Sequence, residues 1–152
     1  MGPITIRMMS AKDVGAIADI DNRVLGKRRR DYWEMKVESA QARSPIPPLV
    51  AEVDGRVVGF IMGDASGWEY GVPGTVGWID TIGVHPEYQH HGVARALMDE
   101  LVAHMKKVGV TKIYTLVNWR DWDMLRFFDK LRFTRGDMIN LELKVCRQPK
   151  KV

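Results

Sequence analysis

One short stretch, residues 84–98 with the sequence VHPEYQHHGVARALM, constrains the fold of this chain more than any other. It follows an apolar, strand-like run over residues 75–84 and leads into apolar residues at helical spacing over residues 94–105. A strand therefore turns into a helix here, and Gly92 stands where the helix has to begin. Since residues 89–95 include no acidic side chain, the unpaired N–H groups and the helix dipole predict a site that attracts phosphate.

The same turn has a plainer interpretation, in which Gly92 only eases the connection between a strand and a helix. His90, His91 and Arg95 could add hydrogen-bond donors or positive charge near a bound anion. The turn lacks the repeated glycines of a Walker loop or a dinucleotide-binding loop, so those two nucleotide sites are not expected.

The composition indicates an ordinary globular chain. Its 152 residues, 45% hydrophobic and 28% charged, favour one domain with an apolar core. The net charge of +4 suits an anionic ligand but is too small to indicate nucleic acid. The single cysteine, Cys146, excludes an internal disulfide. No apolar run approaches the ~18 residues of a membrane span and no signal peptide is recognisable, so we expect a cytoplasmic protein without a membrane partner.

Apolar periodicity and turn residues predict the other elements. Asp54-Gly55 is a strong hairpin signal between two strands. We expect strands over residues 4–8, 49–53, 57–62, 75–84, 112–117 and 138–145, and helices over residues 10–25, 31–43, 92–105 and 122–131. This order predicts an α/β fold whose mixed, mostly antiparallel sheet has one parallel strand–helix–strand crossover and helices on both faces. We expect a single domain over residues 1–147 and a loose tail over residues 148–152.

Two segments resemble the motifs of the GNAT acetyltransferase superfamily. Residues 79–98 resemble its cofactor motif, whose Gln/Arg-x-x-Gly-x-Gly/Ala loop is matched by Gln89, Gly92 and Ala94. Residues 121–133 resemble, less closely, the pattern Asn-x-x-Ala-x-x-Phe-Tyr-x-x-x-Gly-Phe. The predicted order of elements also matches the GNAT fold over nearly the whole chain.

The resemblance implies an N-acetyltransferase that uses acetyl-CoA, or another acyl-CoA, and releases CoA. The acceptor, usually a primary amine, would attack the thioester directly in a ternary complex, so no nucleophilic side chain is needed. A backbone N–H of the strand before the loop would stabilise the oxyanion. The residues that the resemblance assigns to the cofactor are Ile82, Gly83 and Val84 for the pantetheine arm, Gln89, His90, His91, Gly92, Val93, Ala94 and Arg95 for the pyrophosphate loop, and Asp121 and Phe128 from the second motif.

The second motif departs from the family pattern at three positions. Phe128 stands where the family commonly has the tyrosine that protonates the leaving thiolate, Asp121 replaces asparagine, and Arg132 replaces glycine. General acid catalysis is typically worth ~10²–10⁴-fold, so turnover is slow or another donor serves. Tyr114 and Tyr70 are candidates by residue type. Phe128 itself also fits a plain role as a core aromatic.

Two carboxylates are candidate general bases for the amine. Asp80 lies in the strand that leads to the cofactor loop, where burial would raise its pKa and suit it to accept a proton. The alternative is that Asp80 points to solvent or pairs with an arginine. Glu69 is the second candidate, with a simple surface role as its alternative.

The remaining charged and histidine residues suggest structural roles. The run over residues 27–30 (KRRR) is expected to be a solvated helix connection, with an acidic acceptor or partner as the alternative. His85 precedes a proline and is expected to be structural. The four histidines lack metal-ligand spacing with nearby carboxylates, so no metal is expected.

The acceptor class is left open by the sequence. A small-molecule amine and a protein or peptide amine are both compatible with it, and residues 25–48 and 66–75 are expected to shape the acceptor site. Two other functions remain: an acyl-CoA-binding sensor that has lost catalysis, suggested by Phe128 and Asp121, and a basic nucleic-acid-binding module, which no motif supports. We expect no nucleic-acid partner, and a homodimer is compatible with the family.

Overall fold

The computed structural model describes residues 1–43, 45–67 and 75–146. The chain divides into two compact units, Met1–Leu116 and Val117–Val152.

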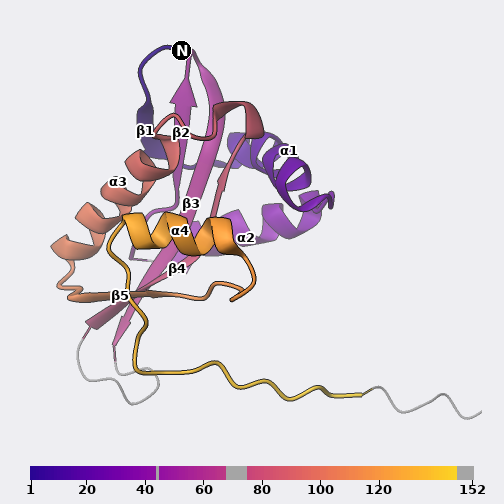
Figure 1. Ribbon diagram of the computed structural model, residues 1–152. Coiled ribbons are helices and arrows are strands. Elements are labelled where there is room, and N and C mark those ends of the chain that lie inside the picture. Colours follow the sequence, from indigo (N-terminus) through magenta and orange to yellow (C-terminus); the bar gives the residue numbers. More distant parts are fainter. Residues whose placement is uncertain (44, 68–74, 147–152) are drawn as a thin grey trace, which may run out of the picture. The chain divides into compact units, whose positions relative to one another are not determined.

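The first unit is a five-stranded mixed sheet with helices on both faces (Figure 1). The sheet order is β1-β2-β3-β4-β5, with every neighbouring pair antiparallel except β4 and β5, which are parallel and joined through helix α3. This confirms the predicted fold class. The elements are β1 (Thr5–Met8), η1 (Ala11–Asp13), α1 (Val14–Leu25), α2 (Arg30–Arg43), β2 (Leu49–Val53), β3 (Arg56–Gly67), β4 (Thr75–Val84), η3 (Pro86–Tyr88), α3 (Val93–Lys107) and β5 (Lys112–Thr115).

Strand β3 separates the two helical layers because its successive side chains point to opposite faces of the sheet. Gly59 and Gly63 face α3, whereas Phe60 and Met62 pack into the core beneath α1 and α2. That core comprises Met9, Val14, Ile17, Ala18, Ile20, Trp33, Val37, Val50, Phe60 and Met62. The ring of Trp33 meets that of Phe60 edge-on at a centroid distance of 5.1 Å.

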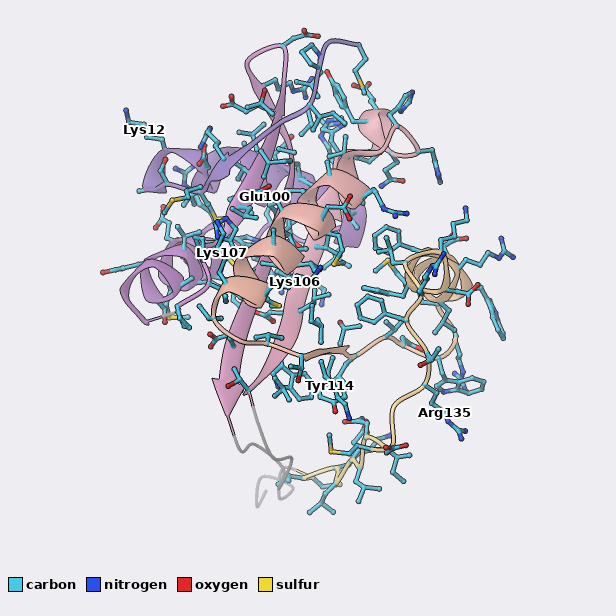
Figure 2. The ribbon with its side chains drawn as sticks, turned by 90° about the vertical axis from the view of Figure 1, so that its left-hand side faces the viewer. Lys12, Glu100, Lys106, Lys107, Tyr114 and Arg135 are labelled. Carbon is cyan, nitrogen blue, oxygen red and sulfur yellow. The ribbon has the colours of Figure 1, made fainter. Side chains whose placement is uncertain are left out.

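Glycines let helix α3 approach the sheet at backbone distance. A Cβ on Gly59 would lie 3.0 Å from Val93, and one on Gly77 would lie 2.6 Å from the sulfur of Met105. A Cβ on Gly63 would lie 2.6 Å from the carbonyl oxygen of Trp78 and 3.0 Å from Met105. Figure 2 shows α3 in front of the strands, with Glu100, Lys106 and Lys107 along its length. The packing at these glycines fixes where the helix begins and ends over the sheet.

A buried carboxylate ties α1 to α2. Asp21, only 4% exposed, accepts two hydrogen bonds of 2.9 Å from Arg29 and one of 2.9 Å from the indole N–H of Trp33. Burial opposes ionisation, but the hydrogen bonds from Arg29 and Trp33 hold the pKa of Asp21 below its usual value. Two of the four basic residues at 27–30 form ion pairs within this layer. Arg29 pairs with Asp21, and Arg30 pairs with Glu34.

The second unit contains helix α4 (Trp122–Lys130). Asp121 caps it by accepting a 3.2 Å hydrogen bond from the N–H of Met124. Phe128, 5% exposed, packs edge-on against Phe127 and Phe133, as expected for a core aromatic. Arg132 adopts φ +67°, a conformation that favours glycine, so the departure from the family's glycine is accommodated at some strain.

The strand predicted over residues 138–145 is wrong. These residues form no helix or strand in the structure, and the alternate side chains of Ile139, Leu141, Leu143 and Val145 are 79–87% exposed. Alternation alone cannot make a strand, because each strand needs a partner for its backbone hydrogen bonds.

Most other boundaries agree with the prediction. The hairpin at Asp54-Gly55 is confirmed, with φ values of +51° and +75°. β3 extends to Gly67, five residues beyond the predicted end, and β5 stops at Thr115. Within the described residues, no helix combines the length and apolar character needed to cross a membrane.

Candidate functional site

Among the residues that the structure describes, the end of β4 has an edge without a strand partner. β4 pairs with β5 only from Val76 opposite Lys112 to Ile79 opposite Thr115, and then continues alone on that side to Val84. The hydroxyl of Thr115 donates a 3.2 Å hydrogen bond to the carbonyl of Ile79, at the point where pairing stops. On the described part of β4, residues 80–84 therefore present backbone groups that an extended ligand can pair with.

Side chains within the turn brace it against β4. The amide Nε2 of Gln89 donates to the carbonyl of Val84 at 3.0 Å, and Nδ1 of His91 lies 2.7 Å from the carbonyl oxygen of Gln89. Gln89 and His91 thus hold the turn in shape, and the carbonyl of Val84 is already engaged. His90 follows with φ +63°, an additional turn residue in the left-handed region.

Helix α3 begins in the manner expected of an anion site. Gly92 is its N-cap, with φ +85° and no side-chain cap, and the first turn holds no acidic residue. The carbonyl of Gly92 accepts a hydrogen bond from the N–H of Ala96. The N–H groups of Val93, Ala94 and Arg95 precede this first helical hydrogen bond, so they have no carbonyl acceptor within the helix.

Space and anchoring around this terminus also suit a ligand. A Cβ on Gly92 would meet nothing within 4 Å, so packing does not require glycine; the backbone conformation does. The buried side chain of Val93 packs against β3 and fixes the helix start. Arg95 is exposed and sits 3.6 Å from Asp99, so its charge can be recruited by an anion.

Asp80 occupies a β-bulge on β4. Met62 pairs with Thr81 and Gly63 with Ile79, which leaves Asp80 as the extra residue. Its side chain is 53% exposed, so about half of its surface is open to solvent. Asp80 forms an ion pair of 2.6 Å with Lys36 of α2, where a solvent-facing or arginine-paired carboxylate was the alternative.

Lys36 and Tyr32 complete this cluster from α2. Nζ of Lys36 donates to the hydroxyl of Tyr32 at 2.9 Å and lies 5.3 Å from the centre of its ring. Burial alone would lower the pKa of Lys36, but the hydrogen bonds to Asp80 and Tyr32 raise it above its ordinary value. The ammonium therefore stays charged throughout the physiological range.

His85 is structural, as predicted. It is 1% exposed, its Nδ1 accepts a 3.1 Å hydrogen bond from the N–H of Glu87, and its Nε2 lies 3.2 Å from the guanidinium of Arg56. Burial, with further repulsion from Arg56 and Arg23, lowers the pKa of His85 and keeps the ring neutral. Its role is to shape the turn between β4 and η3.

The other predicted site residues fall into three groups. Tyr114, labelled in Figure 2, lies on β5. Its ring centre lies 5.1 Å from that of Trp78. Asp121 and Phe128 belong to the second unit. Glu69 and Tyr70 lie outside the described residues. Among the residues the structure describes, no three His, Cys, Asp or Glu side chains gather in a way that could hold a metal ion.

Sequence reasoning missed Lys36, Tyr32 and the bulge. Lys36 is 44 positions before Asp80 in the sequence. Trp33 and Val37 give α2 a buried side, but their spacing does not indicate which residue of the sheet lies beside Lys36. Neither residue next to Asp80 on β4 is a glycine or proline that would mark the bulge. The signal that could have drawn attention is a lysine four residues after a tyrosine, which places both on one helix face, but that spacing is common.

Comparisons with known proteins agree with this geometry. Residues 16–133 match the model of the Acetyltransferase (GNAT) family. A protein named as an acetyltransferase from Pectobacterium atrosepticum is 30% identical over 136 residues, covering 90% of this chain and 92% of that protein. Another acetyltransferase, from Sodalis glossinidius, is 34% identical over 108 residues, covering 71% of each chain.

Solved structures share the fold. Aminoglycoside N-acetyltransferase AAC(6')-Iy in complex with CoA superposes with a TM-score of 0.82 at 16% identity, covering 96% of this chain and 97% of that chain. A ribosomal-protein-alanine N-acetyltransferase from Brucella melitensis gives a TM-score of 0.76 at 20% identity, covering 95% of this chain and 100% of that chain. The family match spans most of the chain and includes both sequence motifs, the free edge of β4 and the uncapped start of α3. The chain belongs to the GNAT acetyltransferase family.

Proposed function

We propose that this protein is an N-acetyltransferase that transfers an acetyl group from acetyl-CoA to a primary amine in a ternary complex and releases CoA. The observation that carries the proposal is the pairing of an uncapped, glycine-started helix with a free strand edge, joined by one braced turn. A donor with an extended arm and a pyrophosphate needs both features side by side.

The residues fit the donor in two places. Backbone groups of Ile82 and Gly83 would pair with the pantetheine arm as a short added strand. The amides of residues 90–95 would bind the pyrophosphate, helped by the dipole of α3 and by the charge of Arg95. The neighbouring aminoglycoside acetyltransferase was solved in complex with CoA, which is consistent with this assignment.

The chemistry places few demands on side chains. An amine attacks the thioester carbonyl directly, and a backbone N–H on the free edge of β4 would stabilise the developing oxyanion. We assign Asp80 as the general base that takes the proton from the attacking amine, directly or through water. Glu69 remains the second candidate. A thiolate is a tolerable leaving group, so water can protonate it if Phe128 occupies the position of the usual acid.

The acceptor is proposed only as a class. The named neighbours modify an aminoglycoside and a ribosomal-protein alanine, so a small-molecule amine and a protein or peptide amine are both reasonable. Neither neighbour exceeds 20% identity, so their particular acceptors are not transferred to this chain.

A CoA-release assay tests the proposal. The protein is incubated with acetyl-CoA and a panel of aminoglycosides, polyamines, amino acids and peptides, and any acetylated product is identified by mass spectrometry. We expect acetyl-CoA binding in calorimetry and amine-dependent release of CoA. Tight binding without transfer across the whole panel would favour the sensor function, and absence of binding at millimolar acetyl-CoA would overturn the assignment.

A further inference from the structure

We infer that Lys36 of α2 is a positioning residue for the reaction, which orients the carboxylate of Asp80 toward the amine. The inference rests on the proposed function. It adds a residue from the helical layer, far from both family motifs in sequence, to the machinery of the site.

The geometry of the bulge makes such a partner necessary. As the extra residue of a β-bulge, Asp80 lies outside the regular pairing between β3 and β4. Its carboxylate is half exposed, and one oxygen, Oδ2, is held by Nζ of Lys36 at 2.6 Å. Among the described residues the other oxygen has no partner, so it remains free to accept a proton. A single short contact therefore fixes the carboxylate and leaves one oxygen for the amine.

Lys36 is itself held in place. Its side chain is only 22% exposed, less than half the exposed fraction of Asp80, and it donates a second hydrogen bond to the hydroxyl of Tyr32. The ammonium also lies 5.3 Å from the ring of Tyr32 and 5.9 Å from that of Trp33. Trp33 is anchored in turn by Asp21. The position of the Asp80 carboxylate is thus set by the core of the α1–α2 layer.

Lys36 is the charged partner of Asp80 in the described structure. The other members of this contact network are Tyr32, held through Lys36, and Met62 and Gly63 of β3, which lie opposite the bulge; none of these three is a cation. Removing Lys36 would therefore free the half-exposed carboxylate to turn away from the amine.

A purely structural role for Lys36 makes a different prediction. In that case its loss would lower the melting temperature and leave kcat of the folded protein at the wild-type value. A positioning role predicts the reverse, because a half-exposed ion pair contributes little to folding whereas a displaced base lowers kcat. The melting temperature and kcat, measured on the same variants, therefore separate the two roles.

The experiment uses Lys36→Met, Lys36→Arg and, as a matched control, Lys106→Met at an exposed position near the end of α3. The assay for CoA release gives kcat and KM with the best amine from the panel, and the melting temperature of each variant is measured beside them. We expect Lys36→Met to lower kcat for the amine about tenfold, while KM for acetyl-CoA and the melting temperature stay close to those of the wild type. Lys36→Arg should restore most of the rate, and Lys106→Met should match the wild type.

A double-variant cycle shows whether Lys36 acts through Asp80. In an Asp80→Asn background, Lys36→Met should cause no further loss, since the group it positions is gone. Multiplicative losses, or a kcat of Lys36→Met equal to that of the wild type, would overturn the inference while leaving the proposed function intact. A wild-type protein that acetylates no amine would instead overturn the proposed function itself.

Discussion

The side-chain amide of Gln89 is hydrogen-bonded to the carbonyl of Val84 at 3.0 Å, so the loop residue folds back onto the strand that precedes it. His91 adds a second contact, to the carbonyl of Gln89. Side chains of the turn therefore hold its shape. A pre-shaped loop loses little conformational freedom on binding, which would favour affinity for the proposed donor.

The start of α3 can be tested with two glycines of matched conformation. Gly92 and Gly109 precede and follow α3 with φ of +85° and +87°, and a Cβ at either would meet nothing within 4 Å. Valine at either position incurs similar backbone strain, of about 1–2 kcal/mol. Only Gly92→Val places a side chain at the proposed pyrophosphate site, among the backbone amides of residues 90–95.

Calorimetry with CoA measures the difference. We expect Gly92→Val to weaken binding at least tenfold and Gly109→Val to leave it within about twofold of the wild type. Equal affinity in the two variants would show that the pyrophosphate binds elsewhere.

Asp80→Asn tests the assignment of the base. The amide cannot accept the proton of the amine, so the rate should fall, by about 10²–10⁴-fold at low pH. The loss should shrink as pH rises, because a growing fraction of the free amine is already deprotonated. The measurement is kcat/KM for the amine against pH. A uniform loss at every pH would assign Asp80 to acceptor binding instead.

Gly63→Ala tests the close packing of β3 against its neighbours. The new Cβ would lie 2.6 Å from the carbonyl oxygen of Trp78 on β4, which cannot move as a side-chain end can, so we expect the free energy of unfolding to fall by about 1–3 kcal/mol. Gly15→Ala is the contrasting variant, because Gly15 lies inside α1 and its Cβ would meet only the guanidinium of Arg30 at 3.4 Å. Alanine should stabilise α1 by about 0.5–1 kcal/mol. Urea unfolding measures the change in the free energy of unfolding for both variants. A Gly63→Ala variant more stable than the wild type would refute the packing argument.

His85 makes folding stability depend on pH. Its pKa in the folded protein is lowered by burial from the ordinary 6.5, so between the lowered value and 6.5 the unfolded chain binds more protons. Stability is therefore fully present above about pH 6.5 and is lost as pH falls below it. His85→Asn should flatten this dependence in urea titrations between pH 5 and 7, while retaining an acceptor for the N–H of Glu87. His104→Asn, on the surface of α3, should leave the slope in place.

The sequence predicted those parts of the protein that local interactions determine. The hairpin at Asp54-Gly55 and the start of α3 at Gly92 follow from φ preferences and apolar spacing within a few residues. The structural role of His85 was also predicted, since a histidine before proline at a strand end has little freedom. Both the sheet class and the single parallel crossover followed from the order of such local elements.

What the sequence did not predict depends on contacts between distant segments. The ion pair of Asp80 with Lys36 joins residues on β4 and α2, and the bulge that presents Asp80 arises from pairing with β3. The strand expected over residues 138–145 has the right alternation, but pairing is a property of two segments and the pattern describes only one. In both cases the missing information was the identity of the neighbour.

The glycines under α3 have a consequence for long-range effects on cofactor affinity. A 15-residue helix is a stiff rod roughly 22 Å long, seated on the sheet through Gly59, Gly63 and Gly77. A methyl group inserted beneath its middle or far end would tilt the rod and shift its leading amides relative to β4. Substitutions remote from the turn would then weaken binding of the proposed donor, acetyl-CoA, although they contact no atom of it.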